Sequence, residues 1–560
     1  MHTWQFLSLA AFLCLTGTGC AESESAWAAE RGAMQEERPA ESDSRSETFD
    51  FGNETGEEPA ESESESDPSE SEGESDSEAP GSGPVRISGA MRDLTKEEEE
   101  DEEAHPWFFP PRSLNLFVRQ QGSFVPMHGA PGAAGDYVFG KVPDGPYYLR
   151  EGDNVLVTRA RKVDLGVDKL LRDGIVDLDT DSLVRVRLDS LEPWHDRFGD
   201  SGEHGPPYSD VQLVSEQLGF GTSLVLYDMH EGATSADEES VLFVARRIEA
   251  ERGDTLRLVQ HAPRELCLLP GGGVQRYSTA VRALHLPPLS HDGTEVLNIE
   301  GTLAPLPQHE LALDWRLSAF TALAADVHPE AVCAASRLAM RPSSPEPCTV
   351  GWMGFLGELM SMSVGHDAPE RLSGTVRYGN PSRTRTGVVA RAATTFAVAV
   401  QTPDGVAFHL TASVFVQDRP GNLSGRPLLP RIQPPRGLTL DGTEAYSSRV
   451  VDDGAHVIGW QSPEGGAPDV YLLRLQRIDL EDPTHPQPVP VAQFYVDGDA
   501  TSVRLPAEFM EPGNHYSLTV EAVVSDGYAV WNRPLMLNDR YIVSRAAALC
   551  GLLSVAPRAS

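Results

Sequence analysis

Met510-Glu511-Pro512-Gly513-Asn514-His515-Tyr516-Ser517-Leu518-Thr519-Val520-Glu521-Ala522-Val523 is the stretch that decides the fold of this 560-residue chain. The Pro-Gly pair favours a turn. From Tyr516 onward, every second residue is aromatic or apolar, and successive side chains of a strand point to opposite faces. Tyr516, Leu518 and Val520 therefore share one face, and the stretch predicts a turn followed by a buried strand.

Residues 432–545, which surround this stretch, resemble a fibronectin type III domain. In that family a Trp on the second strand packs in the core, and Trp460 matches it. A Pro-Gly turn precedes a Tyr whose hydroxyl fixes the corner between the two sheets, matched here by Pro512, Gly513 and Tyr516. The resemblance implies a β-sandwich. Two features depart from the family: Phe509 replaces the usual Leu, and residues 479–490 lengthen one hairpin.

A second β module is predicted over residues 106–195. Residues 135–150 alternate apolar and polar side chains around the turn sequence Pro143-Asp144-Gly145, which predicts strand, turn and strand. This run resembles a hairpin of transthyretin-like and carboxypeptidase-regulatory-like sandwiches. The resemblance implies a structural or adhesive module.

The fold of residues 205–428 is not assigned by any motif. Strand-like apolar runs are expected at 223–227, 241–245, 255–259, 396–400 and 412–416, and one helix near 316–327. Strands outnumber helices, which fits a sandwich or an irregular propeller. The predicted fold class is therefore mainly β, with multidomain β-sandwich modules behind a disordered acidic N-terminal tether, and with residues 546–560 as a C-terminal tail.

Most of the charge imbalance lies near the N-terminus. Residues 21–105 contain 29 acidic and 6 basic residues, in a chain whose formal net charge is −39. A segment so polar cannot bury enough apolar surface to offset its ordering entropy, so residues 20–105 are expected to be a disordered tether. We expect a solvated spacer. The alternative is an acidic segment that attracts cations or basic partners. The acidity argues against nucleic acid as a partner.

The first twenty residues have the order of an export signal. An apolar run at 6–15 is followed by Gly17, Thr18, Gly19 and Cys20, and the run is too short to span a bilayer. This resembles a bacterial lipoprotein signal, which implies removal of residues 1–19, attachment of a lipid to Cys20, and a place at the cell envelope, anchored in the outer membrane and facing the periplasm or the surface. Gly17 and the lack of Lys or Arg depart from the family. An ordinary cleaved signal, with Cys20 incidental, is the alternative.

Four further cysteines would meet an oxidising compartment if the protein is exported. Cys333 and Cys348 flank the Pro-rich segment 341–347 and are predicted to close it as a disulfide. The pairing of Cys267 and Cys550 stays open. No spacing of Cys and His is typical of zinc.

No motif for nucleophilic, metal-dependent or phosphate-binding catalysis is present, and no cofactor is predicted. Asp177, Asp179 and Asp181 alternate as in a calcium loop, but Ser182 and Leu188 replace the Gly and Glu that an EF-hand needs. We expect a solvated hairpin there, with weak calcium binding as the alternative.

The remaining chemical candidates are local. Three His-Asp neighbours begin at His195, His291 and His366 and are expected in surface turns. Glycines 271–273 have no helix after them, so we do not expect a phosphate cradle. The aromatic run 107–109 is expected to pack at a domain junction, with a sugar platform as the alternative.

These features favour a non-enzymatic, lipid-anchored envelope protein that binds protein or polysaccharide. The contrasting hypothesis is an exported hydrolase or carbohydrate-active enzyme with a divergent catalytic domain in residues 205–428. A structural envelope subunit without a free ligand is a third possibility. Fold alone does not separate them.

Overall fold

Strands dominate the chain because its segments alternate apolar and polar residues. Along β11 (Ser182–Asp189) the side chains are alternately buried and exposed at every position. The computed structural model describes residues 82–93, 113–132, 135–178, 182–196, 207–242, 246–343, 351–365, 369–382, 386–482, 484–525, 527–538 and 543–557. Within these ranges the fold class is mainly β, as predicted.

The described helices are short. The predicted helix near 316–327 consists of α2 (Leu317–Thr321) and α3 (Ala324–Val327), and α4 is Pro420–Leu423. Three short 3-10 helices, η3 (Ala250–Arg252), η4 (Ala507–Phe509) and η5 (Pro534–Asn538), complete this set.

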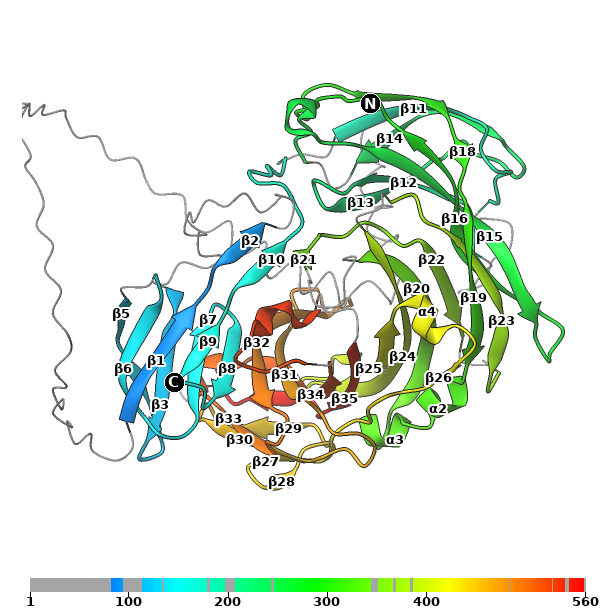
Figure 1. Cartoon of the computed structure of the whole chain (residues 1–560). Helices are drawn as coiled ribbons and strands as arrows, with labels where there is room; N and C mark the ends of the chain where they lie inside the picture. The colour runs from blue at the N-terminus through cyan, green and yellow to red at the C-terminus, as the bar shows by residue number, and fades with distance from the viewer. Residues whose placement is uncertain are drawn as a thin grey trace, which may run out of the picture.

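One 19-stranded sheet, here called the long sheet, runs through the N-terminal, middle and C-terminal parts of the chain (Figure 1). Its first strands are β4 (Ser123–Met127), β3 (Asn115–Gln120), β7 (Tyr147–Glu151) and β8 (Asn154–Thr158). The C-terminal strands β32 (Gln487–Asp497), β31 (Val470–Asp479), β34 (His515–Val524) and β35 (Val543–Leu549) follow.

The middle of the chain continues the long sheet from β35. In spatial order it adds β25 (Ala407–Asp418), β24 (Gly387–Gln401), β20 (Val332–Ser343), β22 (Met360–Val364), β16 (Val274–His285), β15 (Arg257–Leu268), β12 (Asp210–Ser215) and β13 (Phe220–Leu224). Short flanking strands are β18 (Ala304–Pro305), β29 (Arg449–Val451) and β36 (Leu553–Val555).

Two seams join the parts of the long sheet. At the β8–β32 seam, residues 154–157 pair in parallel with residues 493–496. At the β25–β35 seam, residues 414–417 pair antiparallel with residues 543–546. Backbone hydrogen bonds therefore connect the three parts. The parts are not separate domains joined by linkers alone.

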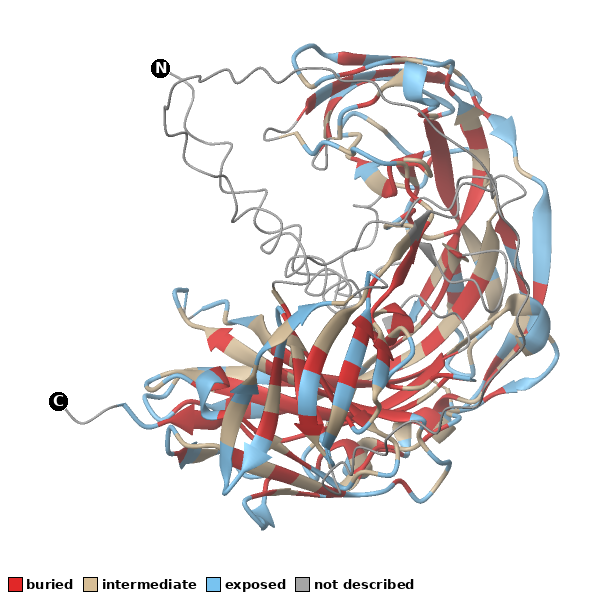
Figure 2. Ribbon diagram, turned by 60° about the vertical axis from the view of Figure 1, so that its left-hand side comes forward, coloured by how far each residue is buried: buried red, intermediate tan, exposed pale blue. Residues whose placement is uncertain are grey.

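Three smaller sheets cover the outer face of the long sheet (Figure 1). The first, β28 (Thr443–Glu444), β27 (Arg436–Leu440), β30 (His456–Gln461) and β33 (Ser502–Leu505), completes a C-terminal β-sandwich. The second is β23 (Leu372–Gly379), β19 (Gln308–Trp315) and β26 (Pro427–Leu428). The third is β14 (Ser235–Leu242), β11 and β17 (Leu297–Thr302). One apolar cluster extends from the sandwich into the middle part, and Figure 2 shows buried residues running along these strands.

The opposite face is covered at the N-terminal end by a sheet of β5 (Gly129–Pro131), β6 (Tyr137–Pro143), β1 (Ser82–Ser88) and β9 (Lys162–Asp164). Its core also includes Phe415 and Leu472 from the other parts of the chain. A last small sheet is β2 (Met91–Asp93), β10 (Val167–Lys169) and β21 (Gly351–Trp352).

Three sequence predictions need correction. The tether does not extend to residue 105, because β1 and β2 lie within it and Val85 and Ile87 are fully buried. Residues 135–150 contain the two predicted strands, but no hairpin: β6 pairs with β1 and β5, whereas β7 pairs with β3 and β8. Residues 546–555 are not a tail, since they complete β35 and form β36 in the core.

Candidate functional site

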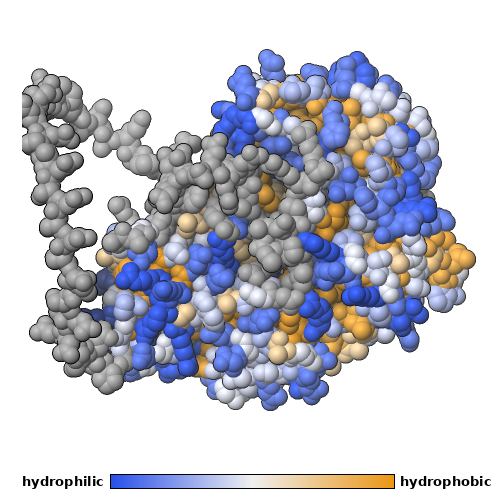
Figure 3. All heavy atoms as spheres, in the orientation of Figure 1, coloured by the Kyte–Doolittle hydropathy of each residue, from blue (hydrophilic) through white to orange (hydrophobic). Residues whose placement is uncertain are grey.

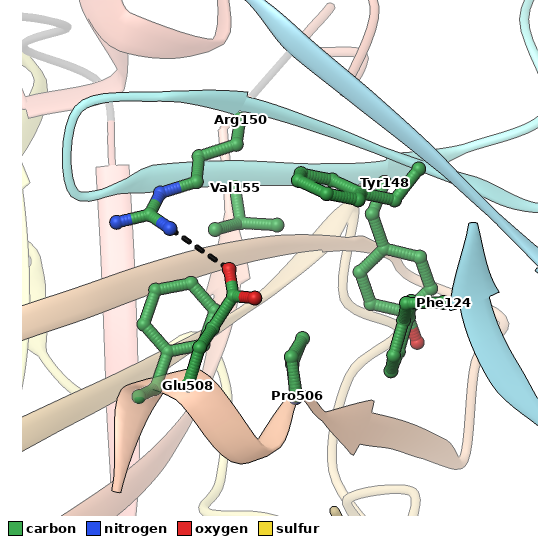
Figure 4. A pocket seen from close by; sticks show the side chains of 8 residues that line it. Phe124, Tyr148, Arg150, Val155, Pro506 and Glu508 are labelled. Carbon is green, nitrogen blue, oxygen red and sulfur yellow. Dashed lines mark hydrogen bonds and ion pairs between the residues drawn. The ribbon is translucent and has the colours of Figure 1, made fainter. Parts of the chain in front are cut away.

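A cleft at the β8–β32 seam is the first candidate (Figure 4). Its lining combines aromatic residues with one ion pair and comes from both sides of the seam: Phe117, Phe124, Tyr148, Arg150, Val155, Pro506, Glu508 and Phe509. The cleft opens to solvent, and its enclosed volume is about 10 Å³, which accommodates about one water molecule. This is too small for an organic ligand.

The contacts across this cleft join the N-terminal part to the C-terminal sandwich. Arg150 Nη1 donates to Glu508 Oε1 over 2.8 Å, and its guanidinium carbon lies 4.7 Å from the centre of the Phe509 ring. The Tyr148 hydroxyl accepts the backbone N–H of Arg504 at 3.3 Å. Burial raises the pKa of Tyr148, although this hydrogen bond opposes the shift. The cleft is therefore best described as a packed junction.

Glu151, at the end of β7 beside this junction, is a buried carboxyl group. Burial raises its pKa to about 7, while a 3.4 Å hydrogen bond from the Ser113 hydroxyl opposes the rise and the Asp153 carboxylate adds to it. At neutral pH the site thus holds a carboxyl group near the midpoint of its titration. Such a group is a functional candidate only where a ligand can reach it, and Glu151 is just 7% exposed.

Glu151→Gln should stabilise the protein at pH 8 by up to about 3 kcal/mol, since one pKa unit corresponds to 1.36 kcal/mol. The folded protein holds this proton to higher pH than the unfolded chain does, so stability from the group is full below about pH 4.5 and falls as the pH rises through about 7. Urea denaturation of both proteins at pH 4 and pH 8 measures the difference. Equal stabilities at pH 8 would contradict the raised pKa.

A charged cluster at the β25–β35 seam is the second candidate, here called the inner-face cluster. It consists of Arg391, Phe415, Glu521, Arg545 and Arg474 on five neighbouring strands. The Arg391 guanidinium carbon lies 3.7 Å from the centre of the Phe415 ring, and that of Arg545 lies 5.7 Å from it. Glu521 accepts ion pairs from Arg474 at 3.4 Å and from Arg545 at 3.6 Å.

The inner-face cluster contains three guanidinium groups and the Glu521 carboxylate. Arg545 is 5% exposed and Glu521 is 7% exposed, so their Coulomb attraction is screened less than that of a surface pair. Guanidinium groups stack on aromatic faces and bind carboxylate or phosphate through paired donors. The cluster therefore strengthens the seam.

Among the residues singled out from the sequence, those of the sandwich come together. Trp460 on β30 is 4% exposed and meets Tyr471 with ring centres 5.0 Å apart. The Tyr516 hydroxyl accepts the backbone N–H of Glu511 at 2.8 Å. Pro512 and Gly513 form the turn between them, and Gly513 has a φ of +84°, which favours glycine.

The structure does not support the predicted disulfide between Cys333 and Cys348. Cys20 and Cys348 lie outside the described residues. Cys333 does not flank a loop as expected, because it is the second residue of β20, which continues to Ser343. Ten residues of strand span about 33 Å, and the five residues from Ser343 to Cys348 can return at most about 18 Å. This geometry opposes the predicted disulfide. Cys267, Cys333 and Cys550 are not disulfide-bonded within the described residues.

The acidic and histidine motifs are not assembled into a site. Asp177 accepts an ion pair from Arg246 at 2.8 Å, while Asp179 and Asp181 lie outside the described residues. Within the described ranges, no three Asp, Glu, His or Cys side chains gather as metal ligands. His195 pairs with Glu231 at 3.1 Å rather than with Asp196.

The other local motifs have similar outcomes. Asp292 accepts hydrogen bonds from Thr294 in a turn and does not contact His291 through a hydrogen bond. Glycines 271–273 lie in the turn between β15 and β16. His366 and the aromatic run 107–109 lie outside the described residues.

Sequence reasoning missed both seams and a buried ion pair. Arg172 donates to both carboxylate oxygens of Asp254, at 2.6 and 2.8 Å, and the Asp254 side chain is fully buried. No spacing signals this pair, because 82 residues separate its members. The Arg-rich composition is the one signal that could have suggested such contacts.

Comparisons with known proteins leave the family open. No family model matches the chain, and no curated protein matches it. A solved structure of the chicken CNTN1 FN1-FN3 domains is similar over 64% of this chain and 94% of that chain, with 9% sequence identity and a TM-score of 0.13. Values this low carry no argument, so the β-sandwich rests on the strands described above. No helix within the described residues is long and apolar enough to cross a membrane.

Proposed function

We propose that this protein is a lipid-anchored, exported bacterial envelope protein that acts as a non-enzymatic binding, adhesion or structural module. The signal-like order of residues 6–20 supports export and anchoring. The observation that carries the binding or structural module is the long sheet, whose two seams connect the N-terminal, middle and C-terminal parts by backbone hydrogen bonds. A body joined in this way presents its surfaces in a fixed arrangement. Membership of the C-terminal sandwich in the fibronectin type III family belongs to the same proposal, as does a transthyretin-like origin of the N-terminal module.

The titratable groups of residues 205–428 support a structural use of that region. The His261 ring nitrogen Nε2 lies 2.7 Å from the carbonyl oxygen of Glu358, and His328 Nε2 lies 2.9 Å from that of Tyr446. Arg257 pairs with Glu216 inside the sheet, and Arg337 pairs with Glu358. These groups hold strands and loops together, which favours the binding module over the alternative of a divergent hydrolase.

The partner in this proposal is a protein or polysaccharide at the cell surface. Cross-linking in intact envelopes, followed by affinity capture of the full chain, identifies the partner. Hydrolysis of a small-molecule substrate that depends on residues of the middle part would instead support the hydrolase hypothesis.

Cells that express the full chain should incorporate labelled palmitate into it, and Cys20→Ala should abolish the incorporation. The physical reason is that a thiol is the acceptor of the lipid, and two or more acyl chains give stable anchoring. Gel fluorography after detergent fractionation measures the label. Cys14→Ala is the matched control and should leave the incorporation unchanged, because that residue lies in the predicted signal. Incorporation that survives Cys20→Ala would overturn the anchor.

A further inference from the structure

Carboxyl groups lie at both ends of the β8–β32 seam. The seam is short, with four residues of each strand paired in parallel. Glu151 lies opposite Asn154 across the β7–β8 turn, and Asn154 pairs with Gln493, so the three residues form one row across β7, β8 and β32. Asp497 directly follows the last paired residue of β32 at the other end. In Figure 1 these strands lie side by side.

Glu151 is a buried carboxyl group in apolar surroundings. It lies on the face of β7 that it shares with Tyr147 and Leu149, and these two are buried in the N-terminal core. Arg150 points to the other face, where it pairs with Glu508 at 2.8 Å. Within the described residues, no basic side chain forms an ion pair with Glu151. When Glu151 ionises, the closed seam therefore holds a buried charge without compensation, which is costly.

The β7–β8 turn beside Glu151 is exposed to water. Burial raises the pKa of Glu151 to about 7, the Ser113 hydroxyl at 3.4 Å opposes the rise, and the Asp153 carboxylate adds to it by repulsion. The charge therefore forms near neutral pH. Gly152 and Asp153 are exposed, and Figure 3 shows hydrophilic residues among hydrophobic ones over this end of the molecule. Movement of the turn into water therefore relieves both the burial and the repulsion.

Asp497 acts in the same direction at the other end of the seam. It is half-buried. Burial, together with the Asp499 carboxylate, raises its pKa, while the Arg159 guanidinium opposes the rise. The Asp497 charge also acts on the Tyr147 hydroxyl, which donates to the Ala160 carbonyl over 2.5 Å. Ionisation of both carboxyl groups therefore places negative charge at the two ends of the seam.

The carboxylate beside the β25–β35 seam is paired instead. Glu521 accepts ion pairs from Arg474 at 3.4 Å and from Arg545 at 3.6 Å. Arg391 and Arg545 lie over the Phe415 ring. Because guanidinium groups compensate the Glu521 charge, we do not expect this second seam to open with the first.

Other contacts keep the N-terminal part attached when β8 moves. Arg533 donates to Asp164 over 3.2 Å and to Asp168 over 2.6 Å, which ties β9 and β10 to the segment after β34. The ion pair between Arg150 and Glu508 holds β7 to the sandwich. The β8–β32 seam can therefore open locally without detachment of the whole N-terminal part.

We propose that the β8–β32 seam is a proton-controlled joint, which is closed while Glu151 is protonated and opens locally when Glu151 ionises. The bond from the Gln493 N–H to the Asp153 carbonyl, 2.8 Å long, is lost first, because Asp153 lies in the turn that moves. The closed form holds the Glu151 proton more tightly than the open form, whose pKa is the ordinary 4.5. Closure is therefore fully favoured below about pH 4.5 and weakens as the pH rises through about 7. This regulation goes beyond the proposed function and does not depend on export or a lipid anchor.

Hydrogen exchange of the full chain, measured by mass spectrometry of its peptides and corrected for the intrinsic rate at each pH, tests the joint. The amides of β8 and β32 should lose protection by up to about 70-fold between pH 5 and pH 8, the ratio that a pKa of about 7 in the closed form and 4.5 in the open form requires. At pH 8 they should exchange faster than the amides of β35. Their exchange should depend little on low concentrations of urea, because a local opening exposes little surface.

Three variants assign the effect to its residues. Glu151→Gln should remove most of the pH dependence, because Gln has nearly the same shape and does not ionise. Asp497→Asn should remove a smaller part. Glu508→Gln is the matched control: Glu508 is a carboxylate of the same junction, but its side chain is 47% exposed and pairs with Arg150, so the pH dependence should remain.

Three results would overturn the proposal. The first is equal protection of the β8 and β32 amides at pH 5 and pH 8. The second is a pH dependence in Glu151→Gln as large as in the unchanged chain. The third is exchange at pH 8 with the same rate and the same urea dependence in β8, β32 and β35, which would assign the pH effect to unfolding of the whole chain.

Discussion

Replacement of Trp460 by alanine should lower the free energy of unfolding by about 3–5 kcal/mol, the usual loss when a buried Trp becomes Ala. Trp460 lies on β30 between the two sheets of the C-terminal sandwich, and its ring meets Tyr471 of β31 edge to face. With 4% of its surface exposed, it leaves a large cavity when truncated. The sheets cannot collapse fully onto that space because their strands are fixed by their hydrogen-bonded neighbours.

Because of the long sheet, this loss of stability should affect the middle part of the chain as well as the sandwich. Trp460 belongs to an apolar cluster that also contains Phe396 and Leu338 of the middle part, and β35 of the sandwich pairs with β25. We therefore expect a single urea transition at a lower midpoint when unfolding is monitored by far-UV circular dichroism. Residues 205–428 should become protease-sensitive in the same transition. Trp531→Ala is the matched control, since Trp531 is 46% exposed and surface changes usually stay within about 0.5 kcal/mol. Separate transitions for sandwich and middle part would contradict the coupling.

The strands of the sandwich could be predicted because their information is local. The alternation after Tyr516 places Leu518 and Val520 in the core, and β34 indeed runs from His515 to Val524. The Pro-Gly turn is equally local, since it depends on the φ that Gly513 adopts. Residues that act through their own neighbours in sequence are visible in a single chain.

The seams could not be predicted because their information is not local. The segment 154–157 reads as an apolar strand, yet nothing in it selects residues 493–496 as its parallel neighbour. That choice depends on which sheet edges remain open after each part has folded. The hairpin predicted at 135–150 failed for the same reason, since β1, from within the supposed tether, takes the place beside β6.

The candidate sites show the same division. The prolines after Cys333 predict a loop flanked by that residue and Cys348, but the strand continues through Pro342 to Ser343, where pairing with β24 decides the structure. The inner-face cluster draws one residue from each of five strands that are scattered along the sequence. Its charged side chains contact one another only after the sheet has placed those strands side by side.

Asp254→Ala should cost about 3–5 kcal/mol, comparable to the Trp460 change but for an electrostatic reason. The Asp254 carboxylate accepts both donors of Arg172 and the backbone N–H of Glu249, at 2.6, 2.8 and 2.7 Å. The hydrogen bond from the Arg172 guanidinium to Asp254 is the largest cause that raises the pKa of Arg172, and burial opposes it. Alanine would leave a guanidinium that is only 10% exposed with the nearby Glu249 as its remaining carboxylate partner.

Two further variants separate this buried pair from ordinary surface charges. Asp237→Ala removes a carboxylate that also lies between two arginines, Arg185 and Arg187, but on the solvent-exposed face of β14, where screening leaves little to lose. The double variant Arg172→Met, Asp254→Leu should regain most of the lost stability, because apolar side chains of similar size replace a buried ion pair at little cost. Urea midpoints of the four proteins test this order. If Asp254→Ala unfolds at the same midpoint as Asp237→Ala, the pair contributes as a surface pair does. The segment before β11 would then be held by its backbone bond from the Arg172 N–H to Gln217 rather than by charge.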